Sequence, residues 1–261
     1  MIKTNIYKKK NNMKYIKLFN TTTEYEAFKN GEDWALPNLS LIEDTYEVKM
    51  TPLVNNNDPA NGFEYVDLGL PSGTLWAKCN VGASKPEESG LYFSWGDSYG
   101  YTKAQVLSGE HEFYPADDKW NNGEPTCDAS VMIKYNTEDG KTVLDPEDDA
   151  AVVNMGGDWH MPTKEQLEEL SANTTSTWTT MNGVNGRLFT SKINENEMFV
   201  PAAGYIYNGS VISEGTSANV WSSSLCVEDP YRAWHLYFYS YSMDVFSNSR
   251  CCGRSVRGVL G

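Results

Sequence analysis

The chain has 261 residues, a formal net charge of −14, 16 tyrosines and 8 tryptophans. This length suffices for one large domain, or for a domain of roughly 200 residues with a small appendage. The negative charge argues against nucleic acid as a partner, because binding phosphates needs clustered lysines and arginines, and it argues equally against an anionic membrane surface. No stretch approaches the roughly 20 apolar residues of a membrane span, and the 21 glycines and 11 prolines favour a turn-rich mixed fold over a helical one.

The N-terminal part of the chain predicts a leader, a small module and a linker. Residues 1–12 are polar and basic with no apolar run behind them, so we expect a disordered leader and no export signal. Residues 13–50 predict a strand at 14–19, a capped helix at 21–31 and one or two strands at 36–50. A unit of roughly 40 residues is too small to be stable by itself, so we expect either an attachment module or an extension packed on the main domain. Residues 51–62 contain Asp-Pro and Asn-Gly steps and predict a linker.

The main domain is expected to begin at residue 63. Its first strands are predicted at 64–68 and 74–79, with a turn between them at 71–73, whereas the polar residues 98–142 predict long loops. Four aromatic residues of this part are expected in the core: Trp76, Tyr92, Phe93 and Trp95. Within the loops, His111, Glu112, Asp117 and Asp118 are potential cation ligands, but their spacing matches no known calcium loop, so we expect acidic surface there and no metal site.

Two helices and a series of short strands are predicted next. The first helix is expected to begin at Asp145 and Pro146 and to end at Gly156, and the second to begin with a capping box of Thr163 and Gln166. Strands are then expected at 186–191, 197–201, 203–206 and 211–212. A final strand at 254–260 is expected to pair near the N-terminus of the domain.

Residues 235–242 alternate strictly between two kinds of side chain. His235, Tyr237, Tyr239 and Tyr241 share one face of a strand, and the apolar Leu236 and Phe238 lie on the other, because side chains in a strand have period two. Tyrosines combine a large contact area with few rotatable bonds, as in binding loops. The row therefore predicts a binding face, although tyrosine alternation also occurs in ordinary half-buried strands.

The residues around this row divide into a loop and a frame. Residues 244–249 mix Asp, Val, Phe, Ser and Asn without hydrophobic period, which predicts a surface loop in which Val245 and Phe246 are exposed for contact. The expected core frame consists of Trp221, Ala233, Trp234, Leu236, Phe238, Val256 and Val259.

Several phrases of this frame carry a resemblance to a known family. The chain resembles the variable proteins of diversity-generating retroelements and the Fibrobacter-type major paralogous domain. The phrases that carry this resemblance are WSSS at 221–224, AWHLYF at 233–238, GRSVRGV at 253–259, the openings EYVDLGLPSGTLW and GLYFSWGD, and WHMPT before the second helix. The resemblance implies an α+β fold, with a C-type-lectin-like domain related to the formylglycine-generating enzyme over 63–261. Its variable region would be 221–257, and a small N-terminal α/β appendage would precede it.

In that family the framework stays fixed while chosen surface positions are rewritten. Carried onto this sequence, the rewritten ligand-binding positions would be Tyr231, Arg232, His235, Tyr237, Tyr239, Tyr241, Ser242, Asp244, Val245, Phe246, Ser247, Asn248, Ser249 and Cys252. The resemblance implies a non-enzymatic protein on a phage virion surface that binds a bacterial surface protein or glycan, with residues 13–50 contacting other virion proteins. The alternative is a bacterial cell-surface adhesin or glycan-binding module.

The sequence offers little for catalysis or metal binding. It has no G-x-S-x-G, H-E-x-x-H, P-loop or Rossmann motif, and its 5 cysteines match no zinc spacing. Free thiols are the default in a bacterial cytoplasm. An oxidase of the formylglycine-generating type is a further alternative, but the adjacent Cys251 and Cys252 do not match its paired cysteines. Calcium lectins of this fold bind the ion and the sugar through residue triplets, and the only similar triplet in this sequence is Glu124-Pro125-Thr126. We therefore expect no enzyme activity, no cofactor and no metal.

Overall fold

The computed structural model describes residues 4–10, 13–19, 39–42 and 58–261. The chain divides into two compact units, residues 1–54 and residues 55–261. Each unit is described by itself below.

The first unit contains a three-stranded antiparallel sheet. Its strands are β1 (Thr4–Lys10), β2 (Met13–Phe19) and β3 (Leu39–Ile42), in the order β1-β2-β3. The strand predicted at 14–19 is confirmed, whereas the disordered leader is wrong for residues 4–10, which pair with β2 along their whole length. Thr, Ile and Tyr in this segment favour a strand once a partner lies beside it. The predicted helix at 21–31 lies outside the described residues, and of the strands predicted at 36–50 only β3 lies within them.

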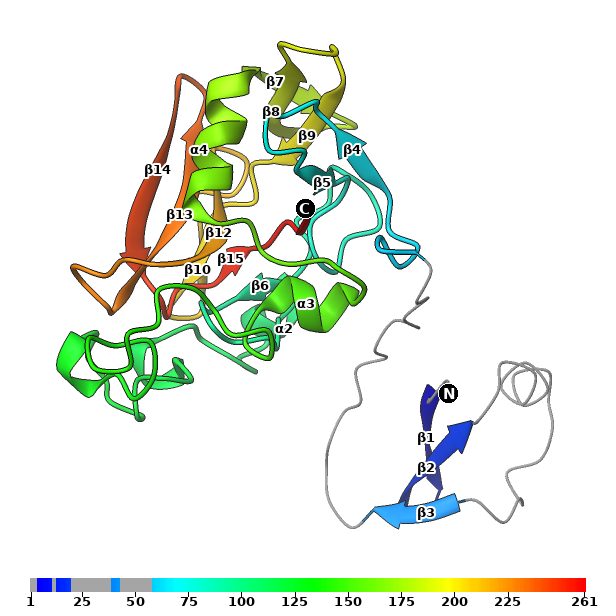
Figure 1. Cartoon of the computed structure of the whole chain (residues 1–261). Coiled ribbons are helices and arrows are strands. Elements are labelled where there is room, and N and C mark those ends of the chain that lie inside the picture. Colours follow the sequence, from blue (N-terminus) through cyan, green and yellow to red (C-terminus); the bar gives the residue numbers. More distant parts are fainter. Residues whose placement is uncertain (1–3, 11–12, 20–38, 43–57) are drawn as a thin grey trace. The chain divides into compact units, whose positions relative to one another are not determined.

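The second unit is mixed α+β, with few helices and several mainly antiparallel sheets (Figure 1). The largest sheet has the order β14-β13-β12-β15-β6. Its strands are β6 (Tyr92–Phe93), β12 (Ser217–Leu225), β13 (Arg232–Tyr239), β14 (Ser242–Ser249) and β15 (Arg254–Ser255). All its pairs are antiparallel except β12 with β15.

Three smaller sheets complete the second unit. One has the order β16-β5-β4, formed by β4 (Tyr65–Asp67), β5 (Leu75–Ala77) and β16 (Val259–Leu260). The others are β7-β8-β9, of β7 (Thr174–Met181), β8 (Val184–Ser191) and β9 (Glu197–Pro201), and the hairpin of β10 (Tyr205–Tyr207) and β11 (Ser210–Ile212). The single strand predicted at 254–260 is divided into β15, in the large sheet, and β16. The pairing beside the first strands of the domain is as predicted, but β16 alone makes it.

The helices of this unit are short. They are α2 (Lys103–Leu107), α3 (Ala150–Met155) and α4 (Lys164–Asn173), with 3₁₀ turns η1 (Pro115–Asp117) and η2 (Ala129–Val131) in the long loops. The capping box that begins α4 is confirmed: Thr163 Oγ1 accepts from Gln166 N at 3.3 Å. The predicted start of α3 at Asp145 is wrong, because Asp149 is the cap and accepts from Ala151 N at 2.8 Å.

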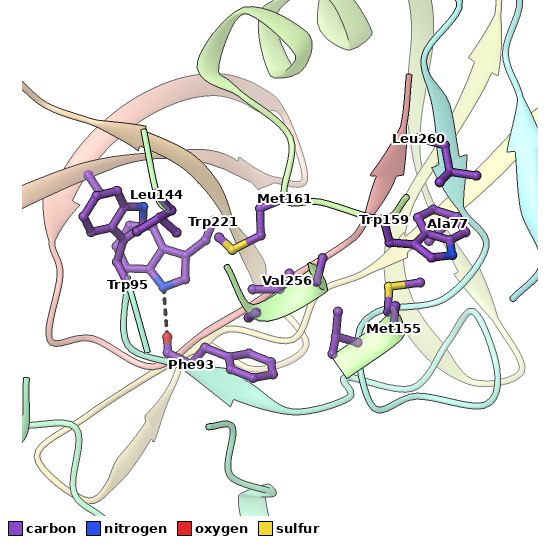
Figure 2. Close-up of a cluster of buried hydrophobic side chains, with 14 of the residues drawn as sticks. Ala77, Phe93, Trp95, Leu144, Met155, Trp159, Met161, Trp221, Val256 and Leu260 are labelled. Atoms are coloured by element: carbon purple, nitrogen blue, oxygen red, sulfur yellow. Dashed lines mark hydrogen bonds between the residues drawn. The ribbon is translucent and has the colours of Figure 1, made fainter. Parts of the chain in front are cut away.

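The core has two large parts. In the first, Trp95, Trp159 and Trp221 pack with Met155 and other apolar side chains, and Trp221 Nε1 donates to Phe93 O at 2.9 Å (Figure 2). The second part joins α4 to the large sheet through the residues Leu167, Leu170, Leu236 and Phe238. The four aromatic residues predicted for the core, Trp76, Tyr92, Phe93 and Trp95, are all buried.

The end of the predicted linker belongs to this core. Ala60 is buried, and its carbonyl oxygen accepts from Trp159 Nε1 at 2.7 Å. Asn61 Nδ2 donates to Met155 O at 2.7 Å. Residues 58–62 are therefore a packed turn of the domain, and the rest of the predicted linker lies outside the described residues.

Candidate ligand-binding surface

The candidate surface lies on the ribbon that β13 and β14 form at the edge of the large sheet. The two strands pair without interruption from Arg232↔Ser249 to Tyr239↔Ser242. Residues paired in this way share a face of the sheet, so the ribbon has two faces of different composition. β14 is an edge strand, and α4 runs beside the ribbon (Figure 1).

One face of the ribbon, called the packed face here, is covered by α4. It comprises Leu236, Phe238, Met243 and Val245, which belong to or pack against the apolar cluster that contains Leu167 of α4. Leu236 and Phe238 are buried, as their alternation predicted. This face holds the ribbon on the domain.

The opposite face and the turn after it carry four aromatic rings, called the aromatic ridge here: Tyr237, Tyr239 and Phe246 on the face, and Tyr241 in the turn. The prediction that Tyr241 continues the same strand is wrong, because β13 ends at Tyr239. Tyr241 is 82% exposed and Phe246 49% exposed, while Tyr237 and Tyr239 are half-buried. The rings touch in sequence, since the centroids of Tyr237 and Tyr239 are 5.5 Å apart and those of Tyr239 and Tyr241 are 4.4 Å apart. Phe246 lies 6.3 Å from Tyr237 across the two strands. The ridge is therefore one continuous patch of contacting rings.

Polar groups accompany the ridge on β14. Asp244 is paired with Tyr237 and Asn248 with Ala233, so both lie on the same face as the rings, and both are exposed. Burial raises the pKa of the Tyr237 hydroxyl, with smaller contributions from Tyr239 and Tyr205. The hydroxyl therefore stays protonated and can donate a hydrogen bond at neutral pH.

The ridge rests on a layer of buried polar and aromatic side chains. His235 stands edge-on to Trp221, with ring centroids 5.6 Å apart, and the Arg254 guanidinium lies 4.3 Å from the centre of the Trp221 ring. Arg254 Nε and Nη1 have no hydrogen-bond partner among the described residues. Burial lowers the pKa of Arg254 to about 10, and burial followed by the charge of Arg254 lowers the pKa of His235 well below its ordinary value.

The turn of the ribbon is held by an arginine from another sheet. Arg187 of β8 donates from Nε and Nη2 to Tyr239 O at 3.1 and 2.9 Å, and from Nη1 to Ser176 O at 3.0 Å. This clamp fixes the backbone from which Tyr239 and Tyr241 project. No sequence pattern identifies Arg187 and Arg254 as supports of the ridge, because a buried arginine leaves no hydrophobic period.

The structure distributes the predicted site residues over several places. On the face of the ridge, or at its turn, lie Tyr237, Tyr239, Tyr241, Ser242, Asp244, Phe246 and Asn248, whereas Val245, Ser247 and Ser249 lie on the packed face. Tyr231 and Arg232 are half-buried at the far end of the ribbon, where Arg232 Nε is 3.9 Å from Asp229 Oδ2.

Four expectations about these residues are corrected. Residues 244–249 form most of β14 and are not a loop, because an aperiodic sequence pairs readily once β13 offers a template. Val245 is half-buried against the α4 cluster and not exposed. His235 is only 2% exposed and Cys252 only 5%, so neither reaches the surface. His235 follows the alternation, but it lies further toward the centre of the sheet than the tyrosines.

Most of the charged and polar side chains discussed for the long loops contact other residues of the domain. His111 stacks on Tyr101 with ring centroids 4.1 Å apart, and Asp118 is buried 4.0 Å from Arg250 Nε. Within the described residues, the acids that come close enough to share a cation are Asp145, Glu147 and Asp148. Lysines already neutralise this group, since Lys134 Nζ lies 2.6 Å from Asp145 and Lys119 Nζ lies 2.7 Å from Asp148. The arrangement stabilises the loops.

A small pocket lies behind the ribbon. It has a volume of about 240 Å³ and is lined by residues that include Val143, Lys164, Val227 and Trp234. The Lys164 ammonium sits 3.8 Å from the centre of the Trp234 ring. Trp234 was predicted in the core frame but is half-buried, with its ring stacked under this lysine.

Comparisons with protein-family models, with curated proteins and with solved structures gave no match. In the described part of the chain, none of the helices has the length and apolar character needed to cross a bilayer. Function therefore has to be argued from the surface itself.

Proposed function

We propose that the protein is a non-enzymatic binding protein that recognises its ligand through the aromatic ridge. The observation that carries this proposal is the exposure of contacting aromatic rings on the uncovered face of an edge ribbon, with Tyr241 at 82%. Clustered tyrosine and phenylalanine rings are enriched at protein interfaces and are uncommon as free surface. The buried layer and the Arg187 clamp support the ridge from behind, which keeps its shape before a ligand arrives.

The chemistry of the ridge fits a bacterial surface protein or a glycan. Tyrosine rings stack on the apolar faces of sugars or pack on side chains, and their hydroxyls, with Asp244 and Asn248 beside them, offer hydrogen bonds. Burying a fully exposed tyrosine would contribute roughly 2 kcal/mol, and the half-buried Tyr237 and Tyr239 would contribute less. Three or four such contacts support useful affinity, and several copies acting together would raise it further.

We further propose that the domain has a C-type-lectin-like fold and that residues 221–257 are its variable region. The mixed α+β architecture with few helices is compatible with this fold. Seven of the positions that the family resemblance marks as rewritten lie on the face or turn that carries the ridge, which supports the assignment. The setting we favour is a phage virion whose copies attach to a bacterial surface. A bacterial cell-surface adhesin is the alternative.

Variation at these positions is the first test. The coding region would be sequenced in many genomes of the source community, together with any neighbouring reverse-transcriptase gene and any near-copy of residues 221–257. Substitutions concentrated at Tyr237, Tyr239, Tyr241, Asp244 and Phe246, with the packed face unchanged, are expected. Even drift over the whole domain, without a neighbouring template, would reject the variable-region proposal and favour an ordinary adhesin.

Binding is the second test. The fluorescently labelled full chain would be incubated with intact bacteria of the same community, and the bound fraction measured by flow cytometry. Replacing Tyr241 by Ser is expected to lower binding at least about tenfold, the effect of roughly 1.4 kcal/mol. Ile193→Ser is the matched control, because Ile193 is 58% exposed and belongs to the loop after β8. Equal loss in both variants would contradict a ridge-specific site.

A further inference from the structure

Two cysteines that are far apart in the sequence meet at the end of β14. Cys127 belongs to the long loops just before η2, and Cys251 follows β14 directly. Their sulfur atoms are 3.5 Å apart and their positions are 124 residues apart in the chain. Both are free thiols. In Figure 1 the loops between β6 and α3 lie beside this end of β14.

The two thiols have different surroundings. Cys127 is half-buried and open to solvent on one side, whereas Cys251 is 1% exposed. The hydrogen bond from the Cys251 thiol lowers the pKa of Cys127 to about 7, and the same bond raises the pKa of Cys251. At neutral pH a substantial share of Cys127 is therefore thiolate, which makes it the nucleophile of the pair, whereas Cys251 stays protonated beside it.

The backbone around the pair is fixed by other contacts. Arg250 Nη1 donates to Tyr135 O at 3.1 Å and to Pro230 O at 3.0 Å, which ties the loops to the end of the ribbon. Ser94 Oγ donates to Cys251 O at 3.1 Å. A disulfide would bring the two sulfurs from their contact at 3.5 Å to the bond length of about 2.05 Å.

We propose that Cys127 and Cys251 form a disulfide on exposure to a low-molecular-weight disulfide such as oxidised glutathione. The Cys127 thiolate attacks one sulfur of the small disulfide, whose S–S bond breaks and releases one small thiolate, which is protonated by water. The Cys251 thiol then gives up its proton to water, its thiolate attacks Cys127 Sγ, and the second small thiolate departs and is protonated by water. Two protein thiols are oxidised, and one small disulfide is reduced to two small thiols.

The third nearby cysteine is left out of this bond. Cys252 is adjacent to Cys251 in the chain, and neighbouring Cα atoms lie about 3.8 Å apart across a trans peptide. Disulfides need Cα atoms about 4.4 to 6.8 Å apart, so a bond between adjacent cysteines would strain the backbone. The hydrogen bond with the Cys251 thiol lowers the pKa of Cys252, and in the proposed product Cys252 keeps its thiol.

The bond would pin the loops to the end of the ribbon that is remote from the ridge turn. It closes a loop of 124 residues, which restricts the unfolded chain strongly. We expect the midpoint of thermal unfolding to rise by about 10 °C on oxidation. This inference is independent of what the ridge binds.

The test uses the full chain, purified in reductant and transferred to a buffer of oxidised and reduced glutathione. After alkylation of remaining thiols, peptide mass mapping without reduction is expected to show Cys127 joined to Cys251. Cys252→Ser should behave like the unchanged protein, whereas Cys127→Ser should form no internal disulfide and show no rise in melting temperature. Cys127 is half-buried, so its serine variant is expected to fold.

Three results would overturn the proposal. They are a bond between Cys251 and Cys252, a glutathione adduct that persists on Cys127, and an unchanged thiol count. The rate of alkylation by iodoacetamide, measured at each cysteine of the reduced protein, is a second test. The rate at Cys127 should rise through pH about 7, whereas Cys79, whose pKa burial raises, should react only at higher pH. Identical pH profiles at the two cysteines would contradict the role given to Cys127.

Discussion

The two faces of the β13–β14 ribbon belong to the same strands but have different roles. On the packed face, Leu236 and Phe238 are buried under α4, whereas Tyr239 and Phe246 on the other face are partly exposed and Tyr241 at the turn is mostly exposed. Free energy of folding comes from apolar area removed from water, so the packed face stabilises the domain and the ridge contributes little. Residues of the ridge can therefore change one by one while the fold persists, which is the property that a variable binding surface needs.

Loss of Phe238 should give the largest effect on stability. Phe238 is fully buried, and its ring lies 6.1 Å from that of Phe189. Phe238→Ala is expected to lower the free energy of unfolding by about 3–5 kcal/mol, because it removes buried area and leaves a cavity. Urea unfolding followed by tryptophan fluorescence measures this. Tyr237→Ala, the neighbour on the opposite face, is the control, and an equal loss there would erase the distinction between the faces.

His235 should make stability depend on pH. Its pKa in the folded protein lies well below the ordinary value of 6.5, because the ring is buried beside Arg254. As the pH falls below 6.5, the unfolded chain takes up a proton that the folded protein does not, so the free energy of unfolding decreases, with a slope of up to about 1.4 kcal/mol per pH unit. His235→Gln should flatten this slope between pH 5 and 6.5. His111, whose pKa burial also lowers, is present in both proteins and cancels in the difference.

The cap of α4 should contribute less. Thr163→Ala removes the side-chain oxygen that accepts from Gln166 N, and we expect the free energy of unfolding to decrease by about 1 kcal/mol. Thr163→Ser keeps an oxygen and should restore most of it. Because α4 covers only the packed face, binding to bacteria at a temperature where the variant is folded should be unchanged. A loss of binding with an intact fold would mean that the helix shapes the ridge as well.

Local signals of the sequence predicted much of this arrangement. The period-two row placed Tyr237 and Tyr239 opposite Leu236 and Phe238, and the Thr163–Gln166 box located the start of α4, because both patterns depend on neighbours in the chain. The helix start predicted at Asp145 is wrong because the acids there pair with lysines of the preceding loops, and Asp149 caps the helix instead.

Contacts between residues that are far apart in the chain could not be predicted from the sequence. Nothing near Arg187 indicates that it clamps the carbonyl of Tyr239, and nothing near Arg254 indicates that it lies on Trp221. His235 looked equivalent to the tyrosines because period two assigns a face but not the depth of burial along the strand. The aperiodic residues 244–249 likewise became a strand through pairing with β13, a contact that local composition does not encode.

Phe246 should show the smallest effect on stability but a specific effect on binding. Phe246 is 49% exposed and Tyr65, on β4 of another sheet, is 50% exposed, so Phe246→Ser and Tyr65→Ser remove rings of similar exposure. Each should change the free energy of unfolding by only about 0.5 kcal/mol, as expected for a surface position. Cell binding should fall only for Phe246→Ser, because only that ring contacts Tyr237 within the ridge. If both variants bind like the unchanged protein, the ligand contacts the turn at Tyr241 and not the full ridge, and the binding surface shrinks to that end of the ribbon.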